Sequence, residues 1–228
     1  MDNNTTESGN GWTLKEWVEK WENGEVDWHH AEVNELLKTH EKRFKEKGRI
    51  LFPWCSKTVD MKYLRDRGFT VIGIEYNEKL VEQFFRDNDL EFDKFENGHF
   101  RTYESVDGGI TIHAGDFLRA TPELVGRIDG VWDKAALVAV GPRDRRRYAD
   151  RLVGMMNPDT VHLVVCVSYD QSKRQGPGFS VPMETVVGLY GSECHIERIC
   201  EATNEHWMDY YGLDWFLEAV YCLKLKSE

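Results

Sequence analysis

Short apolar runs alternate with segments of helical pattern along most of this chain, and this alternation restricts the fold more than any other feature. The runs Arg49–Pro53 and Thr70–Glu75 are rich in branched apolar residues, and a segment with helical spacing follows each of them. Alternating strands and helices call for a parallel sheet with crossover helices. The runs lack a polar alternation, which is typical of strands buried on both faces. We therefore predict a Rossmann-like α/β fold with helices on both faces of the sheet.

Five further runs complete a predicted sheet of seven strands: Ile110–Ala114, Ile128–Trp132, Val161–Ser168, Ile196–Cys200 and Phe216–Leu225. The last two are expected to pair antiparallel, so that an antiparallel C-terminal strand closes a mostly parallel sheet. The charged segment 89–109 is expected to be a loop or an edge hairpin. No linker or internal repeat is visible, and the length suits one domain. Residues 12–228 are therefore predicted to form a single domain.

The segment before the first strand has the pattern of two helices. Thr13 has the position of an N-cap, and Glu16 stands where a reciprocal capping box requires it. A first helix then carries apolar residues at helical spacing on one side, namely Leu14, Trp17, Val18 and Trp21. A second helix is expected from about His30 to Lys45. Residues 1–11 are polar and are predicted to be a disordered tail.

Charge and composition exclude several classes of partner. The formal net charge of −11 argues against a nucleic-acid groove, which needs a basic surface, and against adhesion to an anionic membrane. No apolar run reaches the roughly 18 residues of a membrane span, and the polar start predicts no secretory signal. The five cysteines form no CxxC pair and the histidines are scattered, so no metal site is expected. We expect a cytoplasmic monomer that acts on a small molecule.

Polar residues follow the ends of several predicted strands. Glu75 ends the second strand, about twenty residues past the first turn, where a carboxylate can accept both ribose hydroxyls of a nucleoside. After the third strand, Asp116 can accept a hydrogen bond from an adenine amino group and Phe117 can pack on the ring. Asp133 and Lys134 end the fourth strand, over the centre of such a site. A single strand-end carboxylate is more often a solvated surface group, but the joint placement predicts a nucleoside site.

The first turn narrows the choice of cofactor. It reads Pro53-Trp54-Cys55-Ser56-Lys57 and contains no glycine. A pyrophosphate needs the close approach of bare backbone that glycine permits. The turn therefore argues against NAD, FAD or a nucleoside triphosphate, whereas a cofactor without phosphate, such as S-adenosylmethionine, makes smaller demands on it.

At this point the chain resembles the thiopurine S-methyltransferase family of class I methyltransferases. The matching stretches run in order over nearly the whole chain: Leu14-Lys15-Glu16-Trp17, Phe52-Pro53-Trp54-Cys55-Ser56-Lys57, Val71 to Glu75, Trp132-Asp133-Lys134-Ala135-Ala136-Leu137, Tyr148-Ala149-Asp150, Ser168-Tyr169-Asp170 and Gly176-Pro177-Gly178-Phe179. The resemblance implies a class I methyltransferase fold that binds S-adenosyl-L-methionine.

The resemblance also implies roles for individual residues. Residues 12–47 would form an N-terminal helical lid, and the cofactor pocket would be lined by Trp17, Trp21, Trp54, Glu75, Asp116, Phe117 and Lys134. Without the resemblance, the tryptophans of the first helix would be interpreted as the apolar face of a docked helix. Substrate-side positions fall on Trp28, Phe179 and Trp207. Three positions depart from the family pattern: Trp28 replaces a phenylalanine, and Lys134 and Trp207 replace arginines.

We therefore predict an S-adenosylmethionine-dependent methyltransferase that acts on a small-molecule thiol. A thiolate is a strong nucleophile, so no single indispensable catalytic side chain is expected, and Lys134 and Asp133 are given positioning roles. Transfer to halide, thiocyanate, selenium or a small amine on the same fold stays an alternative. A non-catalytic protein that binds S-adenosylmethionine is a second alternative. The sequence leaves the natural acceptor open.

Overall fold

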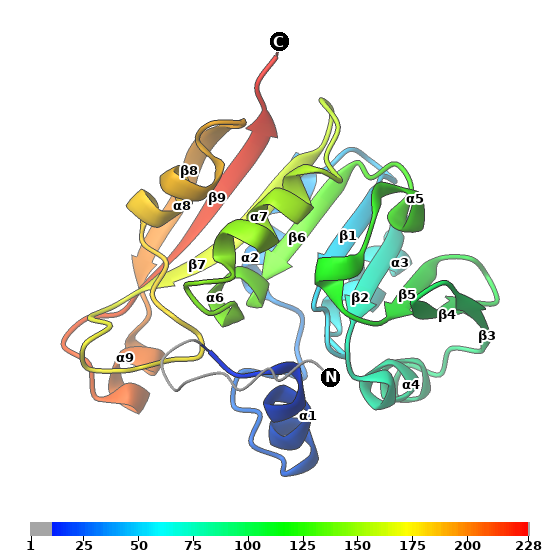
Figure 1. Ribbon diagram of the computed structural model, residues 1–228, viewed down its shortest axis with the longest axis horizontal. Coiled ribbons are helices and arrows are strands. Elements are labelled where there is room, and N and C mark those ends of the chain that lie inside the picture. The colour runs from blue at the N-terminus through cyan, green and yellow to red at the C-terminus, as the bar shows by residue number, and fades with distance from the viewer. Residues whose placement is uncertain (1–10, 228) are drawn as a thin grey trace, which may run out of the picture.

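A computed structural model describes residues 11–227 and shows one sheet with helices on both sides (Figure 1). The strands are β1 (Arg49–Pro53), β2 (Thr70–Glu75), β3 (Phe92–Asn97), β4 (Phe100–Ser105), β5 (Ile110–Ala114), β6 (Gly130–Lys134), β7 (Val161–Ser168), β8 (Cys194–Thr203) and β9 (Leu217–Leu225). The helices are α1 (Leu14–Glu22), α2 (Glu35–His40), α3 (Asp60–Asp66), α4 (Glu78–Asp87), α5 (Pro122–Val125), α6 (Ala136–Ala139), α7 (Arg145–Val153), α8 (Met183–Tyr190) and α9 (Glu205–Tyr211), with 3-10 turns η1 (Glu41–Arg43) and η2 (Phe117–Arg119).

The sheet has the strand order β3-β4-β5-β2-β1-β6-β7-β9-β8. β5, β2, β1, β6 and β7 pair in parallel, whereas β9 is antiparallel to both β7 and β8. The seven predicted strands and the closing antiparallel pair are thus confirmed. The sheet itself has nine strands, because segment 89–109 supplies the hairpin β3–β4, one of the two forms that the sequence left open.

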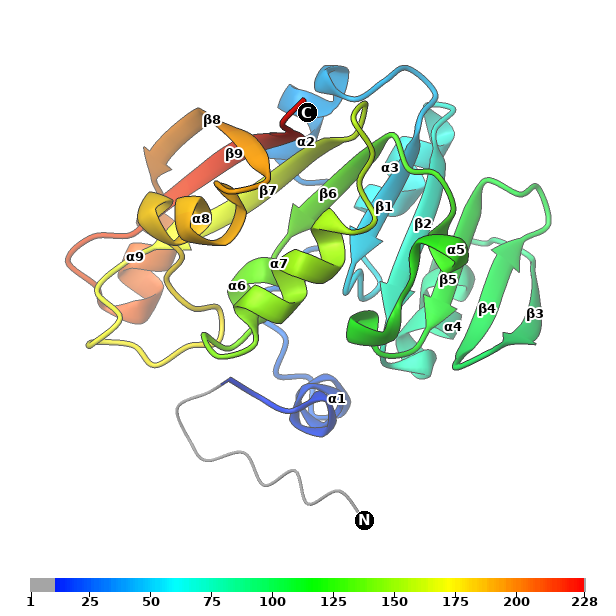
Figure 2. The same ribbon diagram turned by 45° about the horizontal axis from the view of Figure 1, so that its top comes forward.

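Buried side chains form a layer on each face of the sheet. One layer joins strand residues to Leu137, Leu152 and Val186 from helices α6, α7 and α8. The other joins them to Met61 and Phe84 from α3 and α4. Strands that are covered on both sides need no polar alternation, and β2 accordingly has five buried residues in succession. The predicted two-sided cover of helices is confirmed (Figure 2).

Helix α1 and the loop after it lie apart from these layers, below the carboxyl ends of the parallel strands (Figure 1). The predicted lid 12–47 is thus too long, because Leu37 of α2 and Phe44 are buried in the second layer. Its first helix begins with the predicted capping box, in which the Glu16 carboxylate accepts the Thr13 N–H at 2.7 Å and the Thr13 hydroxyl accepts the Glu16 N–H at 3.2 Å. No side chain of α1 is fully buried. Its tryptophans pack on rings of the same segment, and Glu22 forms an ion pair with Lys79 of α4.

Some local predictions need correction. The second helix is shorter than predicted, because α2 begins at Glu35 behind an Asn34 cap and only the single turn η1 follows it. The predicted tail 1–11 lies outside the described residues except for Gly11, where a Cβ would come within 3.0 Å of Gly141. Helices α5, α6 and α9 are not predicted at all. None of the described helices is long and apolar enough to cross a bilayer.

Candidate active site

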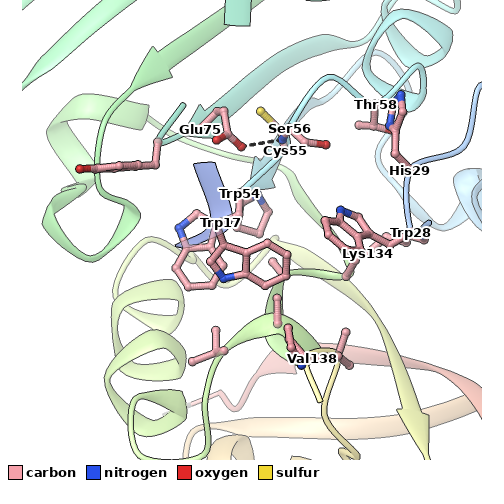
Figure 3. Close-up of a pocket in the computed structure, with 18 of the residues that line it drawn as sticks. Trp17, Trp28, His29, Trp54, Cys55, Ser56, Thr58, Glu75, Lys134 and Val138 are labelled. Atoms are coloured by element: carbon pink, nitrogen blue, oxygen red, sulfur yellow. Dashed lines mark hydrogen bonds between the residues drawn. The ribbon is translucent and has the colours of Figure 1, made fainter. Parts of the chain in front are cut away.

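A cavity of about 930 Å³ lies where the carboxyl ends of the parallel strands meet the N-terminal segment. Figure 3 shows side chains from both regions facing it, Trp17 and Trp28 from one and Trp54, Glu75 and Lys134 from the other. A site of this size, at the carboxyl edge of an open parallel sheet, is where such folds bind their ligands.

The turn after β1 has an unusual backbone. Trp54 has φ +44° and Ser56 has φ +46°, and Ala135, which follows Lys134 after β6, has φ +75°. Side chains rarely adopt this left-handed region, and such residues gather at functional sites. All three line the cavity. The turn therefore achieves without glycine the close approach of backbone that glycine more commonly provides.

Cys55 lies within this turn and lines the cavity, but its thiol is not suited to act as a nucleophile. Its thiol is buried, and a Cβ added at Gly73 would meet the Cys55 Sγ at 2.7 Å, so the sulfur packs closely over β2. Burial raises the pKa of Cys55 well above its usual value, with the nearby Glu75 carboxylate as a second cause. A thiol that stays protonated is a weak nucleophile. Cys55 is thus a packing residue.

Glu75 is the buried carboxylate of the cavity, at the end of β2 as predicted. One carboxylate oxygen accepts the Ser56 N–H at 2.8 Å and the other accepts the Asn77 N–H at 2.7 Å. Burial raises the pKa of Glu75 to about 7, although these backbone donors oppose the shift. The side chain thus joins the turn after β1 to the start of α4, and it stays fixed while its remaining lone pairs face the cavity.

Two buried donors beside Glu75 have no partner among the described residues. The Asn77 side chain uses its oxygen to cap α4 at Lys79, which leaves its Nδ2 unpaired. The Trp54 Nε1 is unpaired as well, and both residues line the cavity. Buried donors normally have acceptors, because an unmade hydrogen bond costs about 1–3 kcal/mol. These two positions therefore suit a bound ligand that carries oxygen or nitrogen acceptors.

Lys134 ends β6 and lines the cavity from the other side. Burial lowers the pKa of Lys134, while Asp60 and Glu218 oppose the shift. Within residues 11–227 no carboxylate comes within ion-pair distance of its ammonium group. The Asp60 carboxylate accepts the Asn34 N–H at 2.8 Å and the Trp132 Nε1–H at 3.0 Å. Lys134 is thus available to an anion in the cavity.

Four tryptophans cover the cavity from the N-terminal segment. The Trp17 ring lies 4.7 Å from the Trp12 ring and 5.3 Å from the Trp28 ring, measured between centroids, and Trp21 lies 6.4 Å from Trp28. All four line the cavity. Trp12 is a residue that sequence reasoning missed, because it precedes the helix whose periodicity drew attention to Trp17 and Trp21.

Asp133 and Phe117 lie beneath the cavity and do not line it. One Asp133 oxygen accepts the Leu137 N–H at 3.0 Å and the other accepts the Tyr148 hydroxyl at 2.8 Å. Phe117 is fully buried and lies edge-on to Trp54, with a centroid distance of 6.4 Å. The expectation that both face a bound molecule is corrected: they support Lys134 and Trp54 from below. Asp116 does line the cavity, and it also caps η2 at Leu118.

The predicted substrate-side residues are only partly brought together. Trp28 lines the cavity, but Phe179 is 3% exposed and does not. Trp207 lies on α9 outside the lining, stacked on Tyr211 at 5.2 Å, and Tyr211 is the α9 residue that reaches the cavity. Sequence reasoning also passed over His29 and His30, which line the cavity from the loop after α1.

The sheet order and the cavity at its carboxyl edge define the class I methyltransferase fold, and solved structures of that class superpose on the chain. Over 93% of this chain and 87% of the other, it matches the Burkholderia thailandensis 1,6-didemethyltoxoflavin-N1-methyltransferase with bound 1,6-didemethyltoxoflavin and S-adenosylhomocysteine, with a TM-score of 0.63 and 14% identity. An S-adenosylmethionine-dependent methyltransferase from Anabaena variabilis matches with a TM-score of 0.62 and 12% identity over 95% of this chain and 97% of that one.

Sequence comparison then gives the family. The family model described as thiopurine S-methyltransferase matches residues 12–226. A probable thiopurine S-methyltransferase of Danio rerio is 32% identical over 94% of this chain and 96% of its own length. The thiopurine S-methyltransferase of Mus musculus is 33% identical over 94% and 92%. The chain belongs to the thiopurine S-methyltransferase family of S-adenosylmethionine-dependent methyltransferases.

Proposed function

We propose that the protein transfers a methyl group from S-adenosylmethionine to a small-molecule thiol. The observation that carries the proposal is the pairing, in one cavity, of two polar groups. The first is a buried carboxylate with two donors at the ends of β1 and β2, and the second is an ammonium at the end of β6. Neither the donors nor the ammonium have a partner among residues 11–227. The carboxylate and the two donors suit the polar parts of an adenosyl cofactor. The ammonium suits an anionic sulfur.

The residues at the ends of β1 and β2 fit the cofactor. The Glu75 lone pairs can accept hydrogen bonds from ribose hydroxyls, as acidic residues at this strand end do in nucleotide-binding folds. The unpaired Asn77 Nδ2 and Trp54 Nε1 can donate to the acceptor atoms of the same molecule. Trp17 and Trp21 present aromatic rings, which attract a cation such as a sulfonium. Bound here, S-adenosylmethionine supplies an electrophilic methyl group.

Lys134 is the residue that suits the acceptor. No carboxylate in the described part of the chain pairs with its ammonium, and partial removal from water strengthens the attraction of this group for an anion. A thiolate held there is already nucleophilic, so the remaining task of the chain is to align the sulfur with the methyl carbon. The rings of Trp28 and Tyr211 also line the cavity, which suits an aryl thiol better than a small hydrophilic one.

A mass-spectrometric turnover assay tests the proposal. Purified protein with S-adenosylmethionine is offered aryl and alkyl thiols, thiopurines, selenide, iodide and aromatic amines. We expect methylated aryl thiol together with an equal amount of S-adenosylhomocysteine. Product from amines or iodide alone would replace the thiol by another acceptor. Cofactor binding without any product would instead support the non-catalytic alternative.

A further inference from the structure

The loop between α1 and α2 brings two adjacent histidines, His29 and His30, into the wall of the cavity. We propose that His30 is a catalytic residue that accepts the proton of an acceptor thiol whose sulfur is held by Lys134. This inference rests on the proposed function and adds a specific acceptor class to it, namely thiols that are still protonated at neutral pH.

The carboxylates around Lys134 cannot readily take this proton. Asp60 holds two hydrogen bonds, one on each oxygen, and Asp133 is fully buried with both oxygens bonded. Glu75 is tied to the backbone near the ends of β1 and β2. By contrast, neither ring nitrogen of His30 has a hydrogen-bond partner among the described residues. Glu218, the other carboxylate that acts on Lys134, does not line the cavity. His30 is thus a free proton acceptor in the cavity wall.

The charges that face His30 keep it neutral near pH 7. Partial burial lowers the pKa of His30, Lys134 and His206 lower it further, and Asp60 opposes them. A neutral imidazole can accept a proton, whereas an imidazolium cannot. Lys134 is the charge that lowers the pKa of His30 most, so the ammonium acts directly on the ring.

His29 is a natural control for His30. Its ring lies edge-on to Trp21 with a centroid distance of 5.2 Å, and Lys57, not Lys134, is the charge with most effect on it. Figure 3 shows His29 beside Thr58, whereas Trp28 lies beside Lys134. The His30 ring lies 6.4 Å from that of Trp207 on α9. The two histidines therefore point to different parts of the cavity wall.

The proposed reaction moves one proton and one methyl group. The S–H proton moves to a ring nitrogen of His30 and its electron pair stays on the acceptor sulfur, which Lys134 stabilises as a thiolate. That sulfur forms a bond to the methyl carbon as the bond from the methyl to the sulfonium breaks, and the electron pair of the broken bond remains on the departing thioether sulfur. His30 then releases its proton to water.

The test compares two thiols that differ in acidity. 4-Nitrothiophenol is ionised at pH 7, whereas 2-phenylethanethiol is still protonated there. In His30→Gln we expect kcat/KM for the alkyl thiol to fall about 100-fold, the range for loss of a general base. The value for 4-nitrothiophenol should fall by less than about threefold, because no proton needs removal. His29→Gln should change both values by the same factor.

The pH profile adds a readout that a purely structural role would not move. For wild type and the alkyl thiol, kcat/KM should rise through the pKa of His30, and in His30→Gln the rise should shift to the higher pKa of the free thiol. Equal losses for both thiols, or no loss for either, would overturn the role of His30. If the wild-type protein methylates 4-nitrothiophenol but not 2-phenylethanethiol, the role of His30 fails while the proposed function stands. If it methylates no thiol of the wider panel, the proposed function itself fails.

Discussion

The two sides of the cavity are built by different means. The strand side, which we define as Trp54, Ser56, Glu75 and Asn77, sits at the ends of β1 and β2, and main-chain hydrogen bonds fix its carboxylate. The loop side, defined as Trp28, His29, His30 and Tyr211, comes from a loop and from α9, and His30 is buried only in part. Lys134 lies between the two. Changes on the loop side leave the sheet intact, so the acceptor can vary while the cofactor stays the same.

The largest effect is expected on the strand side. Glu75→Gln keeps the shape of the side chain but removes its charge and the second backbone acceptor, so affinity for S-adenosylmethionine should fall about 100-fold, the upper range for hydrogen bonds to a charged group. Isothermal titration calorimetry measures the change. Glu91→Gln, an exposed position that does not line the cavity, removes the same charge and should bind normally. Equal affinity in both variants would contradict the strand-side assignment.

A second substitution tests the residue between the two sides. Lys134→Met keeps the aliphatic stem but removes the ammonium, and we expect kcat/KM for an aryl thiol to fall about 30-fold, in line with loss of a charge-assisted contact. Affinity for the cofactor should change much less than this. Lys42→Met, on the exposed turn η1, removes a lysine charge away from the cavity and serves as the control. A variant with unchanged turnover would remove Lys134 from the acceptor site.

The same contrast explains what the sequence could predict. Strand ends have fixed positions relative to one another, so Glu75 and Lys134 could be placed in one site from the order of apolar runs alone. Asp133 was misplaced because successive side chains of a strand point to opposite sides, and only Lys134 faces the cavity. The loop side has neither periodicity nor a fixed position. Trp12, His30 and Tyr211 could therefore be found only once the chain was folded.

The smallest expected effect is the change of cofactor affinity with pH, which again separates the strand side from the loop side. Burial raises the pKa of Glu75 from 4.5 to about 7. The ionised carboxylate accepts hydrogen bonds from ribose hydroxyls, and protonation removes one acceptor. As pH falls below about 7, the free protein takes up a proton that cofactor binding must release. Because only one acceptor is lost, the dissociation constant should rise by about tenfold in all between pH 7 and 5.

Calorimetric titrations over this range measure the dependence, with circular dichroism to confirm that the protein stays folded at each pH. Glu75→Gln cannot ionise, so its weaker binding should be independent of pH. His30→Gln lacks a titrating group on the loop side only, and its cofactor affinity should follow the wild-type curve. A flat wild-type curve would show that the Glu75 carboxylate is not in contact with the cofactor. A curve that flattens in His30→Gln would place the titrating group on the loop side instead.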